Sequence, residues 1–286
     1  MRIKLYLLFW IMVSVAKSQS SFELPVWPNG APMDNEIKVE EKVTPEGYIE
    51  FSKEAKLFVY LPDTAKNTHK TILICPGGGY RMLAIKHEGY DIAKWLASEG
   101  FTAVILKYRM PNHHSLIPLS DSQEAMAIIK RNAKKWNIDS NKIGVCGFSA
   151  GGHLASTLST QAIDSLRPNF AILFYPVISM KEGIGHMGSR NNLLENKNDS
   201  VLINKFSNHL RVDAKTPRTL LILADDDAAV IPENSILYYQ ALKKEHIAAS
   251  MRIFPSGSHG FGFRPSYKYH SEIKQIMLDW LNIKTK

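Results

Sequence analysis

The sequence predicts a single α/β domain with a mostly parallel central sheet flanked by helices. Two observations lead to this prediction. From residue 71 onward, short apolar runs alternate with segments of helical spacing, which is the pattern of βαβ units with helices on both faces of a parallel sheet. Before residue 62, β-rich segments follow one another without a helix, which predicts an antiparallel start to the same sheet.

The predicted elements follow in chain order. Residues 19–35 contain three prolines and little periodicity, so we expect an extended lead-in there. Residues 38–43, 48–51 and 56–61 are the expected antiparallel strands. Buried strands are expected at 71–75, 101–106, 142–146, 170–176, 219–223 and 250–254, and helices at 88–98, 121–136, 150–160, 235–244 and 271–281.

One long segment, residues 178–216, interrupts the alternation. It is rich in Gly, Ser and Asn and is longer than most connections in a compact domain. Its place in the order of elements puts it over the carboxyl-terminal edge of the sheet. We interpret it as a small cap or substrate loop inserted into one catalytic domain, residues 19–286.

The N-terminal 18 residues, MRIKLYLLFWIMVSVAKS, predict a secretory signal peptide. Arg2 and Lys4 precede an apolar run, and Ala16 and Ser18 are the small residues that a signal peptidase reads. The alternative is an uncleaved anchor helix, for which the run is short. Cleavage before Gln19 leaves 268 residues with a net charge of +5, and the expected location is periplasmic or extracellular.

Composition and charge exclude several other classes of protein. The chain is 45% hydrophobic and 22% charged with two cysteines, which excludes a disordered chain and a disulfide scaffold. The net charge of +8 raises the question of nucleic acid, but the densest basic stretch, 130–136, ends a predicted helix, where cations are favourable. We therefore expect no nucleic-acid partner, and no internal stretch is apolar enough to span a membrane.

A nucleophile is predicted at Ser149. Residues 147–151, Gly-Phe-Ser-Ala-Gly, fit G-x-S-x-G between a predicted strand and a predicted helix. A sharp turn at this point lifts the Ser149 Oγ above the sheet and directs the Ala150 N–H at a developing oxyanion.

The glycine loop at residues 75–80, Cys-Pro-Gly-Gly-Gly-Tyr, follows the strand expected beside the nucleophile strand. N–H groups of Gly78 and Gly79 are the expected partners of Ala150 in an oxyanion hole. A phosphate-binding loop is the alternative, and it is disfavoured because neither phosphate-loop spacing is present.

In hydrolases whose nucleophile lies on a G-x-S-x-G turn between a strand and a helix, the carboxylate follows the serine in the chain and the histidine comes last. Asp225, Asp226 and Asp227 come directly after a predicted strand. Asp227 is the preferred acid because the Val and Pro that follow return the loop to the core, and Asp226 remains the alternative. His259, in a loop of small residues after the last strand, is the expected base.

Tyr80, His87 and His186 are candidate substrate-binding residues, although His87 could equally begin a helix. No metal or organic cofactor is expected, since the acidic turn lacks any further ligand spacing. Cys75 and Cys146 end neighbouring predicted strands, where disulfide geometry is rare, so two buried thiols are expected.

Seven segments resemble the secreted carbohydrate esterases of the α/β-hydrolase superfamily, which are bacterial acetylxylan and feruloyl-type esterases. The resemblance implies an α/β-hydrolase fold and a triad of Ser149, Asp227 and His259. It covers essentially the whole chain after the leader. The segments are LPVWPNGAP (24–32), CPGGGYRMLAIKHEGYDIAKWLASEGFTAVILKYR (75–109), GFSAGGHLAS (147–156), PVISM (176–180), HMGSRNNLL (186–194), ADDDAAVIPENS (224–235) and HGFGF (259–263).

The resemblance also implies a function: hydrolysis of acetyl or other small acyl groups on plant-wall carbohydrates, with an acylated polysaccharide or oligosaccharide as the substrate. Two alternatives stay open, a feruloyl esterase acting on hemicellulose and a non-catalytic carbohydrate-binding homologue. The second is disfavoured because a binder does not need Ser149, Asp227, His259 and the glycine loop together. No oligomeric state is predicted.

Overall fold

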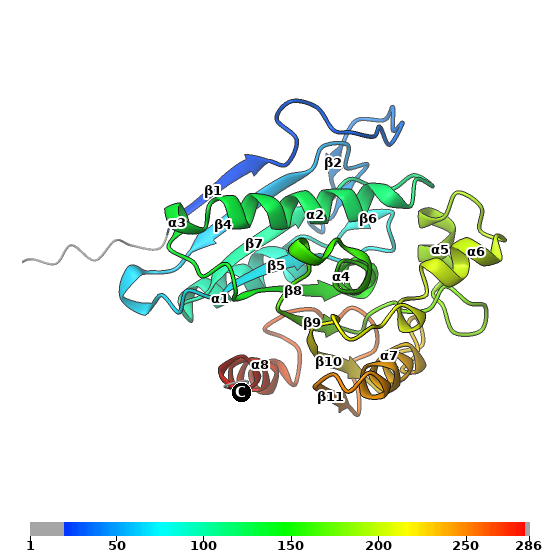
Figure 1. Ribbon diagram of the computed structural model, residues 1–286. Coiled ribbons are helices and arrows are strands. Elements are labelled where there is room, and N and C mark those ends of the chain that lie inside the picture. Colours follow the sequence, from blue (N-terminus) through cyan, green and yellow to red (C-terminus); the bar gives the residue numbers. More distant parts are fainter. Residues whose placement is uncertain (1–19, 284–286) are drawn as a thin grey trace, which may run out of the picture.

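The computed structural model describes residues 20–283 and confirms the α/β architecture (Figure 1). Its main sheet has eight strands in the order β1-β4-β7-β5-β8-β9-β10-β11. β4 pairs antiparallel with β1 and β7, and all other pairs are parallel. In chain order these strands are β1 (Ser20–Pro25), β4 (Lys56–Leu61), β5 (Thr71–Cys75), β7 (Thr102–Lys107), β8 (Ile143–Phe148), β9 (Phe170–Phe174), β10 (Arg218–Ala224) and β11 (Ala249–Phe254).

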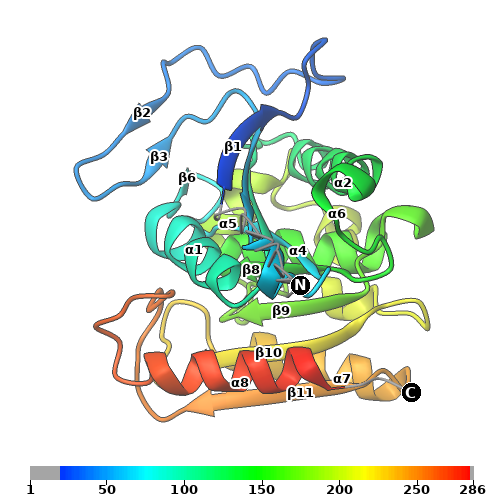
Figure 2. The ribbon, with the colours of Figure 1, turned by 90° about the vertical axis from the view of Figure 1, so that its left-hand side faces the viewer.

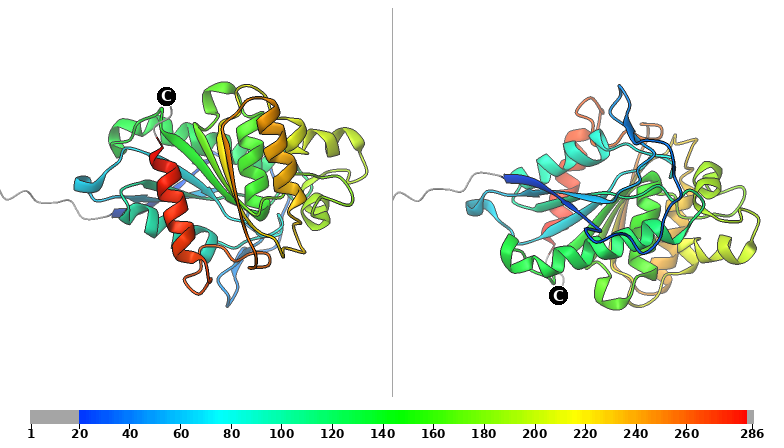
Figure 3. Two further views of the ribbon diagram at one scale, coloured as in Figure 1. Left: turned by 90° about the horizontal axis from the view of Figure 1, so that it is seen from below. Right: turned by 90° about the horizontal axis from the view of Figure 1, so that it is seen from above.

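Helices cover both faces of this sheet, which explains why its central strands are mostly apolar and buried along their whole length. Every residue of β5, β7, β8 and β9 is buried. Helices α1 (Asp91–Ser98) and α8 (His270–Asn282) lie on one face, and α2 (Leu116–Arg131), α4 (Ser149–Gln161) and α7 (Glu233–Lys244) lie on the other (Figures 2 and 3). The remaining helical turns outside the segment 178–216 are η1 (Thr64–Lys66), η2 (Lys86–Tyr90), α3 (Ala133–Trp136) and η3 (Asp164–Leu166).

The start of the chain differs from the prediction. The expected lead-in contains an edge strand, β1, that pairs with β4. Residues 38–43 and 48–51 do not join the main sheet. They supply only β2 (Lys42–Val43) and β3 (Ile49–Glu50), which form a small sheet with β6 (Met82–Leu83) (Figure 2). Val39 and Val43 are 56% and 68% exposed, so the apolar residues of 38–43 do not form the buried face that the prediction assumed, whereas Ile49 of β3 is buried.

The segment 178–216 carries two short helices, α5 (Met187–Leu193) and α6 (Ser200–Lys205), and the turn η4 (Asn208–Leu210). Figure 1 shows α5 and α6 together beyond one end of the sheet. The buried Asn234 side chain fixes the beginning of the segment, since its Oδ1 accepts from the N–H groups of Ile178 and Ser179 at 3.0 Å each. Its amide nitrogen donates to the Ile184 carbonyl at 2.8 Å.

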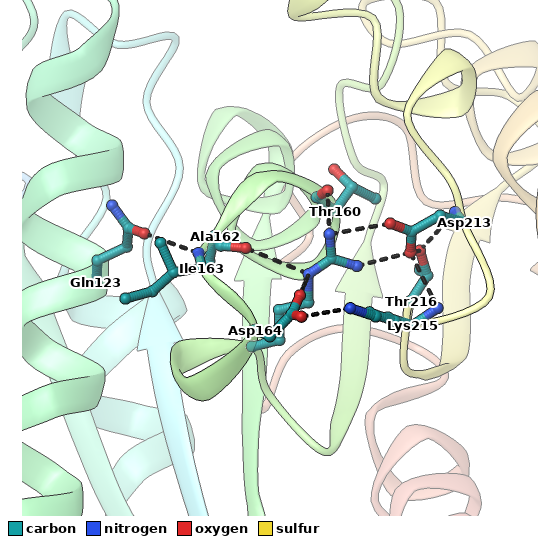
Figure 4. A network of polar contacts seen from close by, with 9 residues as sticks. Gln123, Thr160, Ala162, Ile163, Asp164, Asp213, Lys215 and Thr216 are labelled. Carbon is teal, nitrogen blue, oxygen red and sulfur yellow. Dashed lines mark hydrogen bonds and ion pairs between the residues drawn. The ribbon is translucent and has the colours of Figure 1, made fainter.

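A second polar network holds the end of the same segment. The Arg167 guanidinium makes a bidentate contact with Asp213, at 2.6 and 3.0 Å, and also donates to the carbonyls of Thr160 and Ala162. Lys215 pairs with Asp164 beside it (Figure 4). Both ends of the segment are therefore tied to the helices and strands of the core.

The predicted signal peptide lies outside the described residues. Within residues 20–283, no helix has both the length and the hydropathy that a membrane crossing requires.

Candidate active site

The predicted nucleophile stands on a strained turn between β8 and α4. Ser149 has φ = 52°, in the left-handed region that non-glycine residues rarely adopt. The flanking glycines permit this turn. A Cβ at Gly147 would lie 2.3 Å from the Gly151 carbonyl oxygen, and a Cβ at Gly151 would lie 2.1 Å from that of Cys75. The G-x-S-x-G spacing thus brings α4 against the end of β5.

Ser149, His259 and Asp227 form one hydrogen-bonded chain. Ser149 Oγ lies 2.8 Å from His259 Nε2, and His259 Nδ1 lies 2.7 Å from Asp227 Oδ2. The Asp227 side chain is fully buried, and its other oxygen accepts from the N–H groups of Ala229 and Val230 at 3.0 and 2.9 Å. These bonds fix the carboxylate, which in turn fixes the imidazole with Nε2 free to take a proton.

Asp226, the alternative acid, contacts the backbone of the histidine loop and not the imidazole. Its Oδ1 accepts from the Ser258 N–H at 2.7 Å. The two neighbouring aspartates therefore hold the same loop by different groups, and of the two it is Asp227 that contacts the His259 ring.

The glycine loop faces the nucleophile. Gly78 and Gly79 have φ = 128° and 66°, and a Cβ at Gly77 would lie 2.9 Å from the Ser149 Cβ. Within residues 20–283, the N–H groups of Gly78 and Gly79 find no acceptor, whereas that of Gly77 donates to Glu88. The Ala150 N–H belongs to the first turn of α4, where N–H groups have no intrahelical partner. The loop can thus offer backbone donors to an oxyanion.

These groups open into a pocket of about 780 Å³. Ser149, His259 and the glycine loop form its floor, and α5 and the turn between β2 and β3 form its walls. The polar side chains on this wall that the sequence did not single out are Glu46 and Tyr48 from the turn and Glu50 from β3. The carboxylates and a tyrosine give this wall hydrogen-bonding groups suited to hydroxyl-rich molecules.

His186 and Asn192 reach the pocket from the segment 178–216. Asn192 donates to the Gly79 carbonyl at 2.8 Å, so α5 is bonded directly to the glycine loop. His186 Nδ1 lies 3.2 Å from the Ser189 N–H, which can only donate, and 2.8 Å from the Ser189 hydroxyl, which can also donate. With Nδ1 accepting from both, the proton of the neutral ring is on Nε2. Burial lowers the pKa of His186, with the nearby His259 acting in the same direction, and the neutral ring is a hydrogen-bond donor.

His87 and Glu88 lie on the π-helical turn η2 and both line the pocket. His87 thus begins a helix and also faces the site. Burial, followed by the charges of Arg264 and Lys86, lowers the pKa of His87 to about 4. Arg264 donates to His87 Nε2 at 3.0 Å, which requires the neutral ring.

Tyr80 does not line the pocket, which corrects its prediction as a substrate-binding residue. Its side chain is 2% exposed, and its hydroxyl lies 2.8 Å from Nδ1 of the buried His153. The other ring nitrogen of His153 donates to the Phe206 carbonyl at 2.7 Å. Tyr80 is therefore a packing residue that joins the glycine loop to α4 and to the segment 178–216. The Tyr80 ring packs among apolar residues, and the sequence pattern did not indicate that its hydroxyl would bond to His153.

The structure adds Tyr175 to the neighbours of the site. It follows β9 with φ = 34°, and its ring meets the His259 ring at 4.9 Å between centroids. No motif marks this residue in the sequence. Cys75 and Cys146 are buried free thiols, as predicted. Within residues 20–283, no group of three or more His, Cys, Asp or Glu side chains is placed to hold a metal ion.

The sheet order, the strained turn at Ser149 and the covering helices define an α/β hydrolase, and solved structures of that class superpose on the chain. Within this class, the chain belongs to the BD-FAE family, whose sequence profile matches residues 57–242.

Individual relatives agree with this placement. The chain is 41% identical over 231 residues to an acetylxylan esterase of Xylanibacter ruminicola, covering 79% of this chain and 48% of the relative. It is 34% identical over 222 residues to endo-1,4-beta-xylanase B of Butyrivibrio fibrisolvens, covering 71% and 34%. The chain thus spans about half or less of the length of these curated relatives.

A solved structure covers almost all of both chains. The acetyl ester-xyloside bifunctional hydrolase from Caldicellulosiruptor lactoaceticus superposes with a TM-score of 0.77 at 36% identity, over 93% of this chain and 97% of that one.

Proposed function

We propose that the protein is a serine esterase that removes acetyl or other small acyl groups from plant-wall carbohydrates. The observation that carries the proposal is the hydrogen-bonded chain from Ser149 through His259 to Asp227, at 2.8 and 2.7 Å, on the floor of a polar pocket. The names of the relatives, an acetylxylan esterase and an acetyl ester-xyloside hydrolase, support an acetylated xylan-type substrate. The leader-like residues 1–18 support secretion.

In the first half of the proposed reaction, Ser149 Oγ bonds to the ester carbonyl carbon while its proton passes to His259 Nε2. The carbonyl oxygen becomes an oxyanion that accepts from the N–H groups of Ala150 and of Gly78 or Gly79. The carbon–oxygen bond to the sugar then breaks, and the sugar oxygen takes the proton from His259.

In the second half, water attacks the acyl group on Ser149. His259 takes the water proton, the same N–H groups bind the second oxyanion, and the acid leaves as Ser149 regains its proton. Asp227 stabilises the imidazolium that forms twice in the cycle. None of these steps requires a metal or an organic cofactor.

The pocket is larger than an acetyl group requires, so it leaves space for the sugar to which the acetyl group is attached. Its walls carry Glu46, Tyr48 and Glu50 from one side and the neutral His186 from the other. We assign sugar binding to these walls, with His186 Nε2–H as a donor to a substrate oxygen. His87, whose Nε2 is occupied by Arg264, would shape the pocket beside them.

The test is acetate release from acetylated xylo-oligosaccharides by the wild type and by Ser149→Ala, with methyl ferulate and p-nitrophenyl acetate as further substrates. The proposal predicts acetate release that Ser149→Ala abolishes. Equal rates for both proteins would contradict the nucleophile. Turnover of methyl ferulate alone would replace the deacetylase with a feruloyl esterase, and no turnover of any ester would favour a carbohydrate binder.

A further inference from the structure

Glu88 is a buried carboxyl group whose position the proposed reaction leaves unexplained. The residue is 2% exposed, and both of its oxygens are occupied. Oε2 accepts from the Gly77 N–H at 2.7 Å, and Oε1 accepts from the Tyr175 hydroxyl at 2.8 Å. Burial raises the pKa of Glu88 against the opposing effect of these two hydrogen bonds, so the site holds this group at a cost.

Tyr175 continues the chain of contacts to the histidine loop. Its hydroxyl oxygen accepts from the Gly262 N–H at 2.8 Å, so its own proton must go to Glu88. Gly262 lies three residues after His259, whose ring contacts the Tyr175 ring. One hydrogen-bonded path therefore runs from Gly77 through Glu88 and Tyr175 to Gly262.

The two ends of this path belong to the two halves of the catalytic machinery. Gly77 precedes Gly78 and Gly79, the proposed oxyanion donors, and it leaves no spare room. A Cβ there would lie 2.8 Å from Glu88 Oε2 and 2.9 Å from the Ser149 Cβ. Gly262 belongs to the loop that carries His259. The position of the Gly78 and Gly79 N–H groups relative to His259 thus depends on Glu88 and Tyr175, which take no direct part in the proposed reaction.

We infer that Glu88 is a positioning residue that, through Tyr175, holds the oxyanion loop and the His259 loop in register. By taking the Gly77 N–H, Glu88 orients the loop so that the next two N–H groups face the reacting carbonyl. This inference rests on the proposed esterase function. Breaking the link through Glu88 and Tyr175 should destabilise the transition state more than the bound substrate, because only the transition state needs the oxyanion donors and His259 aligned together.

Tyr175→Phe removes one hydroxyl and leaves the ring. We expect kcat for p-nitrophenyl acetate to fall about tenfold or more with KM within about threefold, because the hydrogen bond to Glu88 and the one from the Gly262 N–H are both lost. Inhibition by a phenylboronic acid, which forms a tetrahedral adduct with the serine, should weaken by a similar factor. The matched control is Tyr238→Phe, since Tyr238 is a fully buried tyrosine of α7 outside the pocket walls. It should keep the wild-type kcat.

Two variants of Glu88 separate positioning from simple packing. Glu88→Gln can accept from Gly77 with its oxygen and donate to Tyr175 with its nitrogen. It keeps the link between the two loops but leaves the Tyr175 proton without its acceptor, so kcat should fall less than in Glu88→Ala. Glu88→Ala loses both bonds and should fall at least as far as Tyr175→Phe.

Several results would overturn the inference: wild-type kcat in Tyr175→Phe, an equal loss in Tyr238→Phe, or a Glu88→Gln as impaired as Glu88→Ala. If Glu88→Ala does not fold by circular dichroism, Tyr175→Phe decides alone. An inactive wild type would count against the proposed function itself, which keeps the two failures distinct.

Discussion

Replacing Asp227 by Asn changes one atom and reverses one hydrogen bond. The N–H groups of Ala229 and Val230 can only donate, and they face the same carboxylate oxygen at 3.0 and 2.9 Å. In the variant, the amide oxygen must occupy this position, so the amide NH₂ faces His259 Nδ1, now 2.7 Å from Asp227 Oδ2. Nδ1 then has to accept, the ring proton moves to Nε2, and the Ser149 proton has no acceptor.

The expected magnitude follows from this tautomer change. An Asp-to-Asn change of the same kind in a serine protease lowers kcat by about 10⁴, or about 5.5 kcal/mol of barrier. We expect a loss of this order for p-nitrophenyl acetate at pH 7, with little change in KM. Nitrogen-15 chemical shifts of the His259 ring should show the proton on Nε2 in the variant and on Nδ1 in the wild type.

Asp226→Asn is the matched control, because Asp226 accepts one N–H from Ser258 and an amide oxygen can do the same. Its kcat should remain within about threefold of the wild type, since that backbone hydrogen bond is preserved. A large loss in Asp226→Asn without one in Asp227→Asn would contradict the role of Asp227 as the partner of His259.

Three further predictions concern the loop, the core and the pocket wall. Gly78→Ala would place a Cβ 2.1 Å from the Met82 carbonyl oxygen at φ = 128°, so the loop must move and kcat should fall by about 10²–10³, the value of one oxyanion donor, in steady-state assays. Burial lowers the pKa of His153 to about 4, so its contribution to the free energy of unfolding is complete above pH 6.5 and declines by about 3 kcal/mol as the pH falls to 4. Urea denaturation should therefore show a smaller loss between these pH values in His153→Gln. Tyr48→Ala should lower kcat/KM about tenfold for acetylated xylo-oligosaccharides and leave p-nitrophenyl acetate unchanged, because Tyr48 lines the pocket wall assigned to sugar binding and p-nitrophenyl acetate carries no sugar.

The central part of the fold was predictable because buried parallel strands are mostly apolar along their whole length. The run at 71–75 coincides with β5, and that at 250–254 ends with β11. The opening of the chain was less predictable, since β1 is an edge strand whose residues are mostly exposed. Its pairing with β4 depends on backbone hydrogen bonds, which any sequence can make.

The site divides in a similar way. Ser149 and His259 could be predicted because their backbone geometry demands glycines and small residues on either side. Choosing between Asp226 and Asp227 needed the direction of each side chain, which neighbouring positions in a loop do not reveal. Tyr175 follows an apolar strand, and only the tertiary structure brings its hydroxyl to Glu88.

The most direct test of the account is the identity of the residue that becomes covalently modified. Intact-mass and peptide mass spectrometry after treatment with diethyl p-nitrophenyl phosphate should show one diethylphosphoryl group, on Ser149, in proportion to the esterase activity lost. Ser149→Ala should be unlabelled and inactive. A label on another residue that tracks the loss of activity, or ester hydrolysis that persists in Ser149→Ala, would contradict the account.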